Sequence, residues 1–334
     1  MNTKEMSGKC PMAKNENISD RILVYIRKIL KIKYGNEKPL RIFHAKTIGL
    51  VQGELKTEKG LPESLRVGLF KQEEPYKIWI RFTNGSPKLS KDINKSARGM
   101  AIKVLDVKSS RYLDEDPEGN TQDIILFTNR FFTPGVGTLQ PAGVKLALPH
   151  FPQFLGAVFT ILTRALIDGI RFFFSARIRT PNVLEEMYYS ATPYSFGENN
   201  AIKWHARPLK TITSVMPKDP EKNFLHDRMK RDLSEDAKEE ISFALFIQFH
   251  ENDNTEPIDD TTVIWKTPFR RVATITVPKQ NFDTPERQKK DLDLTYSPGH
   301  SIIEHAPLGS VNAIRRRVYK VLAKERLEHK ITNS

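Results

Sequence analysis

The C-terminal segment carries the residues whose types and spacing point most directly to chemistry. It reads SVNAIRRRVYKVLAKERLEHK, in which Ser310 can cap a helix and apolar residues recur at helical spacing. On such a helix Arg315 and Tyr319 are four residues apart and Arg326 follows seven later, so all three lie near one stripe. Two guanidiniums beside a phenol favour its ionised form, and a tyrosinate is a hard anionic ligand that suits ferric iron. The alternative is a basic surface helix whose tyrosine packs inward.

Three earlier segments combine arginine, histidine and hydroxyl side chains in a fixed order. They are RIFHAKTIG at 41–49, IRFTNG at 80–85 and ARGMAIKV at 97–104. Followed by the late RxxxY spacing, these motifs resemble the haem-dependent catalase superfamily. The tail TYSPGHSIIEHAPLGSVNAIRRRVY is most similar to the short, catalase-related branch, and the chain length fits that branch. The resemblance runs from about residue 38 to about residue 328 and is weaker between about 130 and 240.

This resemblance implies a role for each matching residue. His44 takes the position of the distal histidine, a general acid–base whose ordinary pKa near neutrality suits proton transfer. Thr83 takes the position of the hydroxyl-bearing residue that orients this histidine. Tyr319 matches the proximal ligand of the haem iron, tyrosine being the catalase axial ligand, and Arg315 matches the arginine that keeps it ionised. The arginines implied for the haem propionates, whose guanidinium forks fit carboxylates, are Arg41, Arg81 and Arg326.

Other positions depart from the family pattern. GNTQDIILF stands where the family has GNN before an apolar strand, so Asn120 is the predicted distal amide and Gln122 the fallback. Asn120 can also be an ordinary loop residue. Phe43 replaces the valine that precedes the distal histidine in typical catalases, and Phe132 (or Phe131) is expected to pack on the haem. These differences favour larger organic hydroperoxides over rapid disproportionation of hydrogen peroxide.

Hydrophobic periodicity predicts the elements that must position these residues. Apolar residues alternate with period two in KIWIRFTNG, GMAIKVLDV and SFALFIQFH, among other short runs. Many such strands without regular intervening helices predict an antiparallel β-barrel with helices packed outside, an α+β fold of the catalase type. We expect a polar lead and a basic amphipathic helix in residues 1–37, the helix running from Ser19 to Tyr34. A single haem domain follows at 38–334, with the barrel at about 38–285 and the proximal helix at about 310–330.

Composition limits the class of protein. The 334 residues include 53 Lys and Arg against 40 Asp and Glu, a formal net charge of +13. An apolar share of 39% and a charged share of 28% exclude a collagen, a disordered tail and a polytopic membrane protein. Cys10 is the single cysteine, which excludes an intramolecular disulfide and a Cys-rich zinc site and suits a reducing compartment. The N-terminus lacks the pattern of a secretory signal, so a cytoplasmic protein is expected.

The apolar segment 154–174 has two interpretations. The first is a buried helix or an apolar cover over a pocket. The second is peripheral membrane association, in which Arg164, Arg171 and the phenylalanines at 172–174 lie at a membrane surface. Pro149 and Pro152 interrupt the uncharged run, so a membrane-spanning helix is not expected.

Together these features predict a haem b-dependent peroxidase or catalase-like oxidoreductase. It would cleave the O–O bond of hydrogen peroxide or organic hydroperoxides, with a small-molecule electron donor, and it would form a homo-oligomer, most simply a dimer. One alternative is a fatty-acid hydroperoxide dehydratase similar to the allene oxide synthases. The non-enzymatic alternatives are a haem sensor or carrier and a basic protein that binds membranes or nucleic acid. Nucleic acid is not expected, because aromatic residues are not interleaved with the basic ones.

Overall fold

A computed structural model provides the fold over most of the chain. The residues it describes are 19–20, 22–24, 27, 41, 44–86, 89–132, 178–210 and 213–331, with side chains as far as Glu328. Phe43, the apolar segment 154–174 and most of the predicted helix from Ser19 to Tyr34 therefore lie outside the described residues.

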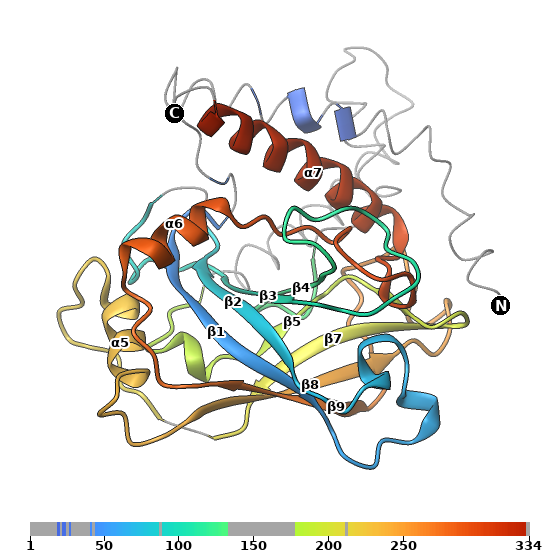
Figure 1. Ribbon diagram of the computed structural model, residues 1–334, viewed down its shortest axis with the longest axis horizontal. Coiled ribbons are helices and arrows are strands. Elements are labelled where there is room, and N and C mark those ends of the chain that lie inside the picture. Colours follow the sequence, from blue (N-terminus) through green and yellow to red (C-terminus); the bar gives the residue numbers. More distant parts are fainter. Residues whose placement is uncertain are drawn as a thin grey trace, which may run out of the picture.

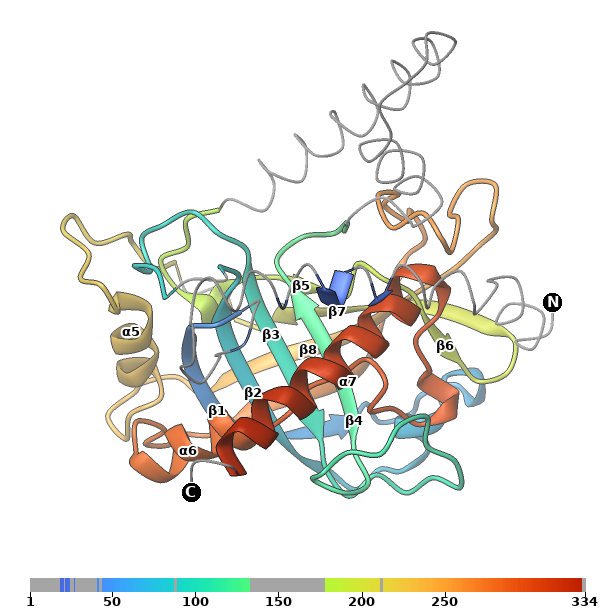
Figure 2. The ribbon, with the colours of Figure 1, turned by 90° about the horizontal axis from the view of Figure 1, so that it is seen from above.

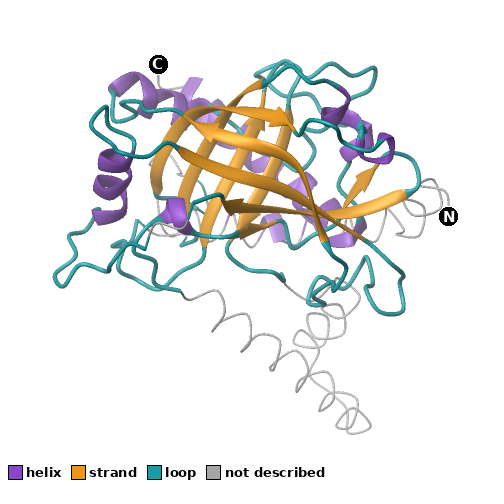
Figure 3. Ribbon diagram, turned by 90° about the horizontal axis from the view of Figure 1, so that it is seen from below, coloured by secondary structure: helices purple, strands orange, loops and turns teal. Residues whose placement is uncertain are grey.

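One nine-stranded antiparallel sheet forms the body of the molecule (Figures 1 and 3). Its strand order is β5-β4-β3-β2-β1-β9-β8-β7-β6, and β5 also pairs with β7. The sheet therefore closes into a barrel that contains every strand except β6, which adds to β7 outside the ring. This confirms the predicted antiparallel barrel. The strands are β1 Thr47–Thr57, β2 Tyr76–Asn84, β3 Arg98–Val104, β4 Gln122–Phe127, β5 Tyr188–Tyr189, β6 Tyr194–Phe196, β7 Asn200–Pro208, β8 Ile241–Phe249 and β9 Phe269–Val277.

Apolar side chains that alternate along the strands fill the barrel interior. In β2, Ile78, Ile80 and Phe82 are at most 1% exposed, whereas Lys77 faces solvent, as the period of two requires. These residues belong to one continuous core with Met100 of β3 and residues of every long strand. Burying each large apolar side chain stabilises the fold by about 1.5–3 kcal/mol. Because the interior is a packed core, a large ligand must bind outside it.

Besides the helical residues near the N-terminus, the described part of the chain has three helices and four short 3-10 turns around the barrel. The helices are α5 Phe224–Asp232, α6 Pro285–Asp293 and α7 Gly309–Ile331. The 3-10 turns are η1 Glu63–Leu65, η2 Gly68–Lys71, η4 Val183–Glu185 and η5 Ile303–His305. Helix α6 begins where the sequence favours it, with Thr284 Oγ1 accepting a hydrogen bond from the Arg287 N–H and Pro285 in the first turn. None of the helices in the described part of the chain has the length and apolarity that crossing a membrane requires.

Helix α7 crosses the outer face of the barrel above β2, β3 and β4 (Figure 2). Its first turn is capped from another part of the chain, because the Asp259 carboxylate accepts a hydrogen bond from the Ser310 N–H at 2.7 Å. The predicted cap, Ser310, therefore supplies the donor and Asp259 the acceptor. Further along the helix, Arg316 forms an ion pair with Asp114 of the loop before β4 at 2.6 Å. These contacts fix α7 over the barrel.

The described positions between Ser19 and Arg27 are helical and pack against α7. Leu23 forms a small apolar cluster with Ile314 and Val318. Arg27 Nε lies 2.8 Å from Glu325 Oε1, so part of the basic face predicted for this segment is paired with α7. Helix α7 is thereby held between the barrel and an N-terminal segment.

Candidate functional site

His44 lies three residues before β1 and packs against β2 and β3. Its Nδ1 is 2.8 Å from Thr83 Oγ1 of β2, so the structure brings together the two residues predicted to act as a pair. Arg81 Nη1 donates to the His44 carbonyl at 3.1 Å. The backbone of His44 has a φ of 56°, the left-handed region that a residue with a side chain occupies only when its surroundings enforce it.

The environment of His44 sets its protonation state. Desolvation of the partly buried ring lowers the pKa of His44 to about 4, and the positive charges of Arg81 and Arg315 act in the same direction. The imidazole is therefore neutral at ordinary pH. A neutral imidazole whose Nδ1 is held by a hydroxyl can accept a proton at Nε2.

Gly99 of β3 makes the close packing around His44 feasible. It pairs with Thr83 across β2 and β3. A Cβ atom at position 99 would lie 2.5 Å from Thr83 Oγ1 and 2.6 Å from His44 Nδ1, both closer than real contacts allow. The sequence motif ARGMAIKV contained this glycine, but only the register of β2 and β3 shows that it makes room for the histidine.

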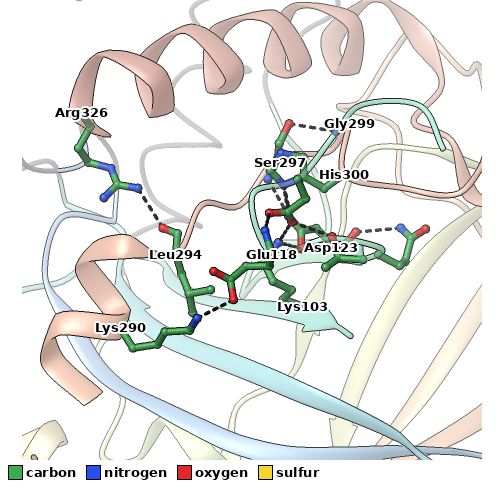
Figure 4. Close-up of polar contacts among 12 residues, drawn as sticks. Lys103, Glu118, Asp123, Lys290, Leu294, Ser297, Gly299, His300 and Arg326 are labelled. Atoms are coloured by element: carbon green, nitrogen blue, oxygen red, sulfur yellow. Dashed lines mark hydrogen bonds and ion pairs between the residues drawn. The ribbon is translucent and has the colours of Figure 1, made fainter. Parts of the chain in front are cut away.

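Two buried arginines, Arg81 and Arg326, and the partly buried Arg41 gather beside α6 near the carboxylate of Asp291. Arg81 Nε donates to Asp291 Oδ1 at 2.6 Å, and Arg41 Nη2 donates to the carbonyls of Asp291 and Leu294 at 2.7 and 2.5 Å. Arg326 of α7 donates to the Leu294 carbonyl at 2.9 Å (Figure 4). The structure therefore brings together the arginines predicted to bind propionates.

The charge of this arginine cluster is unbalanced. Burial and neighbouring guanidiniums lower the pKa of Arg41 to about 9 and that of Arg326 to about 10. Three guanidiniums therefore face the single carboxylate of Asp291, which leaves two positive charges of the cluster uncompensated. Sequence reasoning missed Asp291, and its position in α6 offered no signal that it would meet arginines from β2 and the chain before β1. The cluster is suited to a ligand with two carboxylates.

Arg315 and Tyr319 adjoin on α7, as their spacing predicted. Arg315 Cζ lies 5.7 Å from the Tyr319 ring centroid and 5.7 Å from that of Phe132. Arg315 is 9% exposed, and it donates to Thr192 Oγ1 and Asn312 Oδ1 at 2.8 and 2.9 Å. Burial alone would lower the pKa of Arg315, but its interactions with two tyrosines outweigh burial and raise it. Arg315 therefore provides a positive charge beside the Tyr319 ring.

The structure does not bring Asn120 or Gln122 to this site. In the β3–β4 pair, Gln122 lies opposite Val104, at the far end from Phe127 and Gly99. Gln122 is fully buried and its Oε1 accepts the Ile302 N–H at 3.0 Å, a structural contact. The Asn120 side chain is exposed in the loop before β4. Neither residue meets the geometry that a distal amide requires.

The register of β3 and β4 places a different asparagine, Asn129, at the end of β4 that lies near His44. It follows Thr128, whose N–H donates to the carbonyl of Arg98 beside Gly99. Asn129 is 4% exposed, and its Nδ2 has no hydrogen-bond partner among the described residues. A buried amide without a partner is costly unless a ligand or water satisfies it. Sequence reasoning missed it because the GNN pattern was aligned with GNT, before the strand rather than after it.

A second buried cluster joins β3, β4 and the loop after α6 (Figure 4). Ligand atoms of Asp116, Asp123 and His300 lie within 4.8 Å of one another. Lys103 Nζ occupies the position between the carboxylates, bonding both Asp116 and Asp123, the latter at 2.7 Å. The lysine provides the positive charge that a metal would otherwise supply, so the cluster is an ion-pair network.

The network predicts a pH dependence of stability. Burial lowers the pKa of His300, but hydrogen bonds with Asp116 and Asp123 outweigh it and raise the pKa to about 9. A raised pKa stabilises the fold fully below about pH 6.5, and this contribution decreases as the pH rises and is lost above about pH 9. Between pH 6 and pH 10, the melting temperature should therefore fall more steeply in the wild type than in His300→Gln. Parallel curves would contradict the assignment.

Comparisons with known proteins identify the class of this fold. No protein-family model and no curated protein matches the chain. Solved structures of catalases do match the chain. A fungal catalase is similar with a TM-score of 0.62 and 17% sequence identity, and the match covers 87% of this chain and 60% of the catalase. Catalase A from Saccharomyces cerevisiae has 15% identity and a TM-score of 0.61, with coverages of 87% and 62%. A bacterial catalase has 15% identity and a TM-score of 0.61, with coverages of 90% and 60%.

The chain therefore has the catalase fold, which confirms the resemblance seen in its motifs. It spans about 60% of the length of the catalases it matches.

Proposed function

We propose that the protein is a haem b enzyme that cleaves the O–O bond of hydroperoxides. The observation that carries the proposal is that three groups gather around α7: the His44–Thr83 pair beside β2, the Arg315–Tyr319 pair on the helix, and the arginine cluster to which the helix contributes Arg326. The sequence separates these groups by up to hundreds of residues. The catalase fold of the chain supports the same conclusion.

The residues present fit a haem group. Two uncompensated positive charges in the arginine cluster match the two carboxylates of haem b, which Arg41, Arg81 and Arg326 would hold. Tyr319, which lies beside Arg315, would supply the ligand of the haem iron, and His44 would supply the general acid–base. When bound, the haem supplies a ferric iron that takes up a hydroperoxide and two electrons that break its O–O bond.

The chain itself would move the proton. Neutral His44 accepts the proton of the hydroperoxide at Nε2 and returns it to the distal oxygen, which leaves as water or an alcohol. Thr83 holds the ring by its contact with Nδ1, and Gly99 leaves room for that orientation. Asn129 would donate a hydrogen bond to the incoming oxygen, in place of Asn120.

Haem reconstitution tests the proposal. The purified chain should take up one haem and show a ferric Soret band. The same sample is then assayed with hydrogen peroxide, an alkyl hydroperoxide and a polyunsaturated lipid hydroperoxide, with oxygen release, donor oxidation and rearranged lipid measured separately. Donor oxidation with the alkyl hydroperoxide is the expected result. Absence of haem uptake would refute the proposal, and an epoxide formed from the lipid would instead identify a hydroperoxide dehydratase.

Gly99→Ala should impair this reaction while haem still binds. The added Cβ must displace Thr83 Oγ1 or the His44 ring, so we expect hydroperoxide cleavage to fall by about 100-fold, the cost of a misplacement of about 1 Å. Stopped-flow mixing with an alkyl hydroperoxide measures the rate.

Gly53→Ala is the matched control for this variant. Its added Cβ would lie 2.6 Å from the Thr276 carbonyl, an equally severe contact at a place where β1 pairs with β2 and β9. We expect a lower melting temperature and an unchanged cleavage rate per folded molecule. Equal loss of rate in both variants would show that Gly99 has no special relation to His44.

A further inference from the structure

We propose that Asp92 is a positioning residue that holds His44 in its strained, reactive conformation. The proposal rests on the function proposed above and names the part of the chain that makes His44 competent. Asp92 does not touch His44. It binds Lys46, Asn84 and Arg98. Each of these lies within two residues, along the chain, of a residue that forms the His44 site.

Asp92 is fully buried in the loop between β2 and β3, and all its polar groups are bonded. Its Oδ1 accepts hydrogen bonds from Lys46 Nζ at 2.6 Å and from Asn84 Nδ2 at 2.7 Å. Its Oδ2 accepts the Leu225 N–H in the first turn of α5 at 3.0 Å. Its backbone carbonyl accepts Arg98 Nη2 at 2.8 Å. Asp92 and Arg98 are each 0% exposed, so water does not compete for these contacts.

The three partners of Asp92 mark the borders of the His44 site. Lys46 is two residues after His44, Asn84 directly follows Thr83, and Arg98 directly precedes Gly99. Thr83 bonds the His44 ring and Gly99 provides its space. The Asp92 carboxylate therefore ties the Lys46 and Asn84 segments together, while its backbone carbonyl holds Arg98. The relative placement of these segments fixes the imidazole.

The backbone of His44 needs such an anchor because its φ of 56° is unfavourable for a residue with a side chain. The segment is held at the strained residue and shortly after it. Arg81 binds the His44 carbonyl, and Lys46 is fixed twice, through its carbonyl by the Asn84 N–H at 3.1 Å and through its ammonium by Asp92. Strain of this kind persists only where the surroundings over-determine it.

A second buried carboxylate provides a matched control. Asp123 also accepts a lysine, Lys103, at 2.7 Å and a backbone N–H, that of Ser297, at 2.9 Å. It is 1% exposed, and it lies toward the end of β4 that is remote from Gly99. Asp92→Asn and Asp123→Asn therefore remove similar ion pairs, and only the first borders the His44 site.

The first measurement uses the haem-free protein, so it does not depend on the proposed cofactor. The side-chain nitrogens of ¹⁵N-labelled histidine are recorded by NMR, with the His44 signal assigned from its loss in His44→Ala. Asp92→Asn should change the His44 Nδ1 signal, reporting loss of the bond to Thr83, while Asp123→Asn should leave it unchanged. An unchanged His44 signal in Asp92→Asn would overturn the proposal.

The second measurement uses the haem-loaded protein. Asp92→Asn should slow alkyl hydroperoxide cleavage by about 10–100-fold and should retain haem uptake. This is the usual loss of activity when a residue that orients a functional group is replaced. In a His44→Ala background the same change should have no further effect, because both act through one group. Independent, multiplicative losses would overturn the proposal. Failure of the wild type to bind haem would refute the proposed function and leave the NMR test valid.

A double variant guards against misfolding. Asp92→Asn leaves Lys46 charged and unpaired in a buried position, which can unfold the chain. Lys46→Met combined with Asp92→Asn removes both charges together. The same displaced His44 signal is expected in the folded double variant, and a wild-type signal would count against Asp92.

Discussion

Tyr319→Phe is expected to abolish hydroperoxide cleavage and to change the haem spectrum. The variant keeps the ring on α7 beside Arg315 but removes the oxygen that would bind the iron. Replacing a residue that hydrogen-bonds a metal ligand lowers activity by about 10–100-fold, so removing the ligand itself should lower the cleavage rate by more than about 100-fold. The Soret band should shift, while haem remains held by the arginine cluster with lower affinity. Absorption spectra and single-turnover rates measure both effects.

A matched variant separates this effect from the loss of any buried phenol. Tyr188 lies in the barrel core, and its hydroxyl donates to the Val183 carbonyl at 2.7 Å. Tyr188→Phe should destabilise the fold by about 1 kcal/mol, the usual cost of one hydrogen bond, with spectrum and rate unchanged. If Tyr319→Phe had a wild-type spectrum, Tyr319 could not be the iron ligand.

His44→Ala is expected to slow O–O bond cleavage by about 10²–10⁴-fold without loss of haem. This range is the usual contribution of a positioned general acid–base. Thr83→Val should show a smaller loss, because the imidazole remains but the partner of its Nδ1 is gone. His250→Gln, at the end of β8, is a histidine control that should retain the wild-type rate. Retention of full activity in His44→Ala would exclude the proposed proton transfer.

The pH profile provides a separate check on His44. Its pKa of about 4 means that the neutral, proton-accepting form predominates above about pH 4. Cleavage should therefore be independent of pH near neutrality and should decrease as the pH falls through about 4. The measurement requires an unfolding control at each pH, since buried carboxylates such as Asp291 favour the folded state through a lowered pKa and lose this contribution in acid.

The fold and the paired site residues could be predicted because local patterns encode them. Period-two alternation in β2 fixes which side chains enter the core, and RIFHAK, IRFTNG and RxxxY keep their residues at fixed offsets from strands and helix. His44 and Thr83 meet because both belong to motifs placed by neighbouring strands.

Long-range register accounts for the residues that the sequence did not reveal. Asp291 lies 210 residues from Arg81, and nothing in PERQKKDLD distinguishes it from its exposed acidic neighbours. The sequence pattern favours Asn120 as the distal amide because it precedes the apolar run. The β3–β4 pairing instead places the other end of that run, with Asn129, near Gly99. Similarly, the Asp259 cap of α7 comes from a loop about 50 residues earlier, where no helix signal exists.

Closure of the barrel has a consequence for how this chain folds. β1 pairs with β2, its neighbour in sequence, but its other edge pairs with β9, as in Glu54 with Thr276. During synthesis that edge stays open until more than 200 further residues have emerged, and contacts of such sequence separation form slowly. An open edge can pair with other chains. The partly synthesised chain should therefore aggregate readily and depend on chaperones, and the ligand site beneath α7 can form only after this ring has closed.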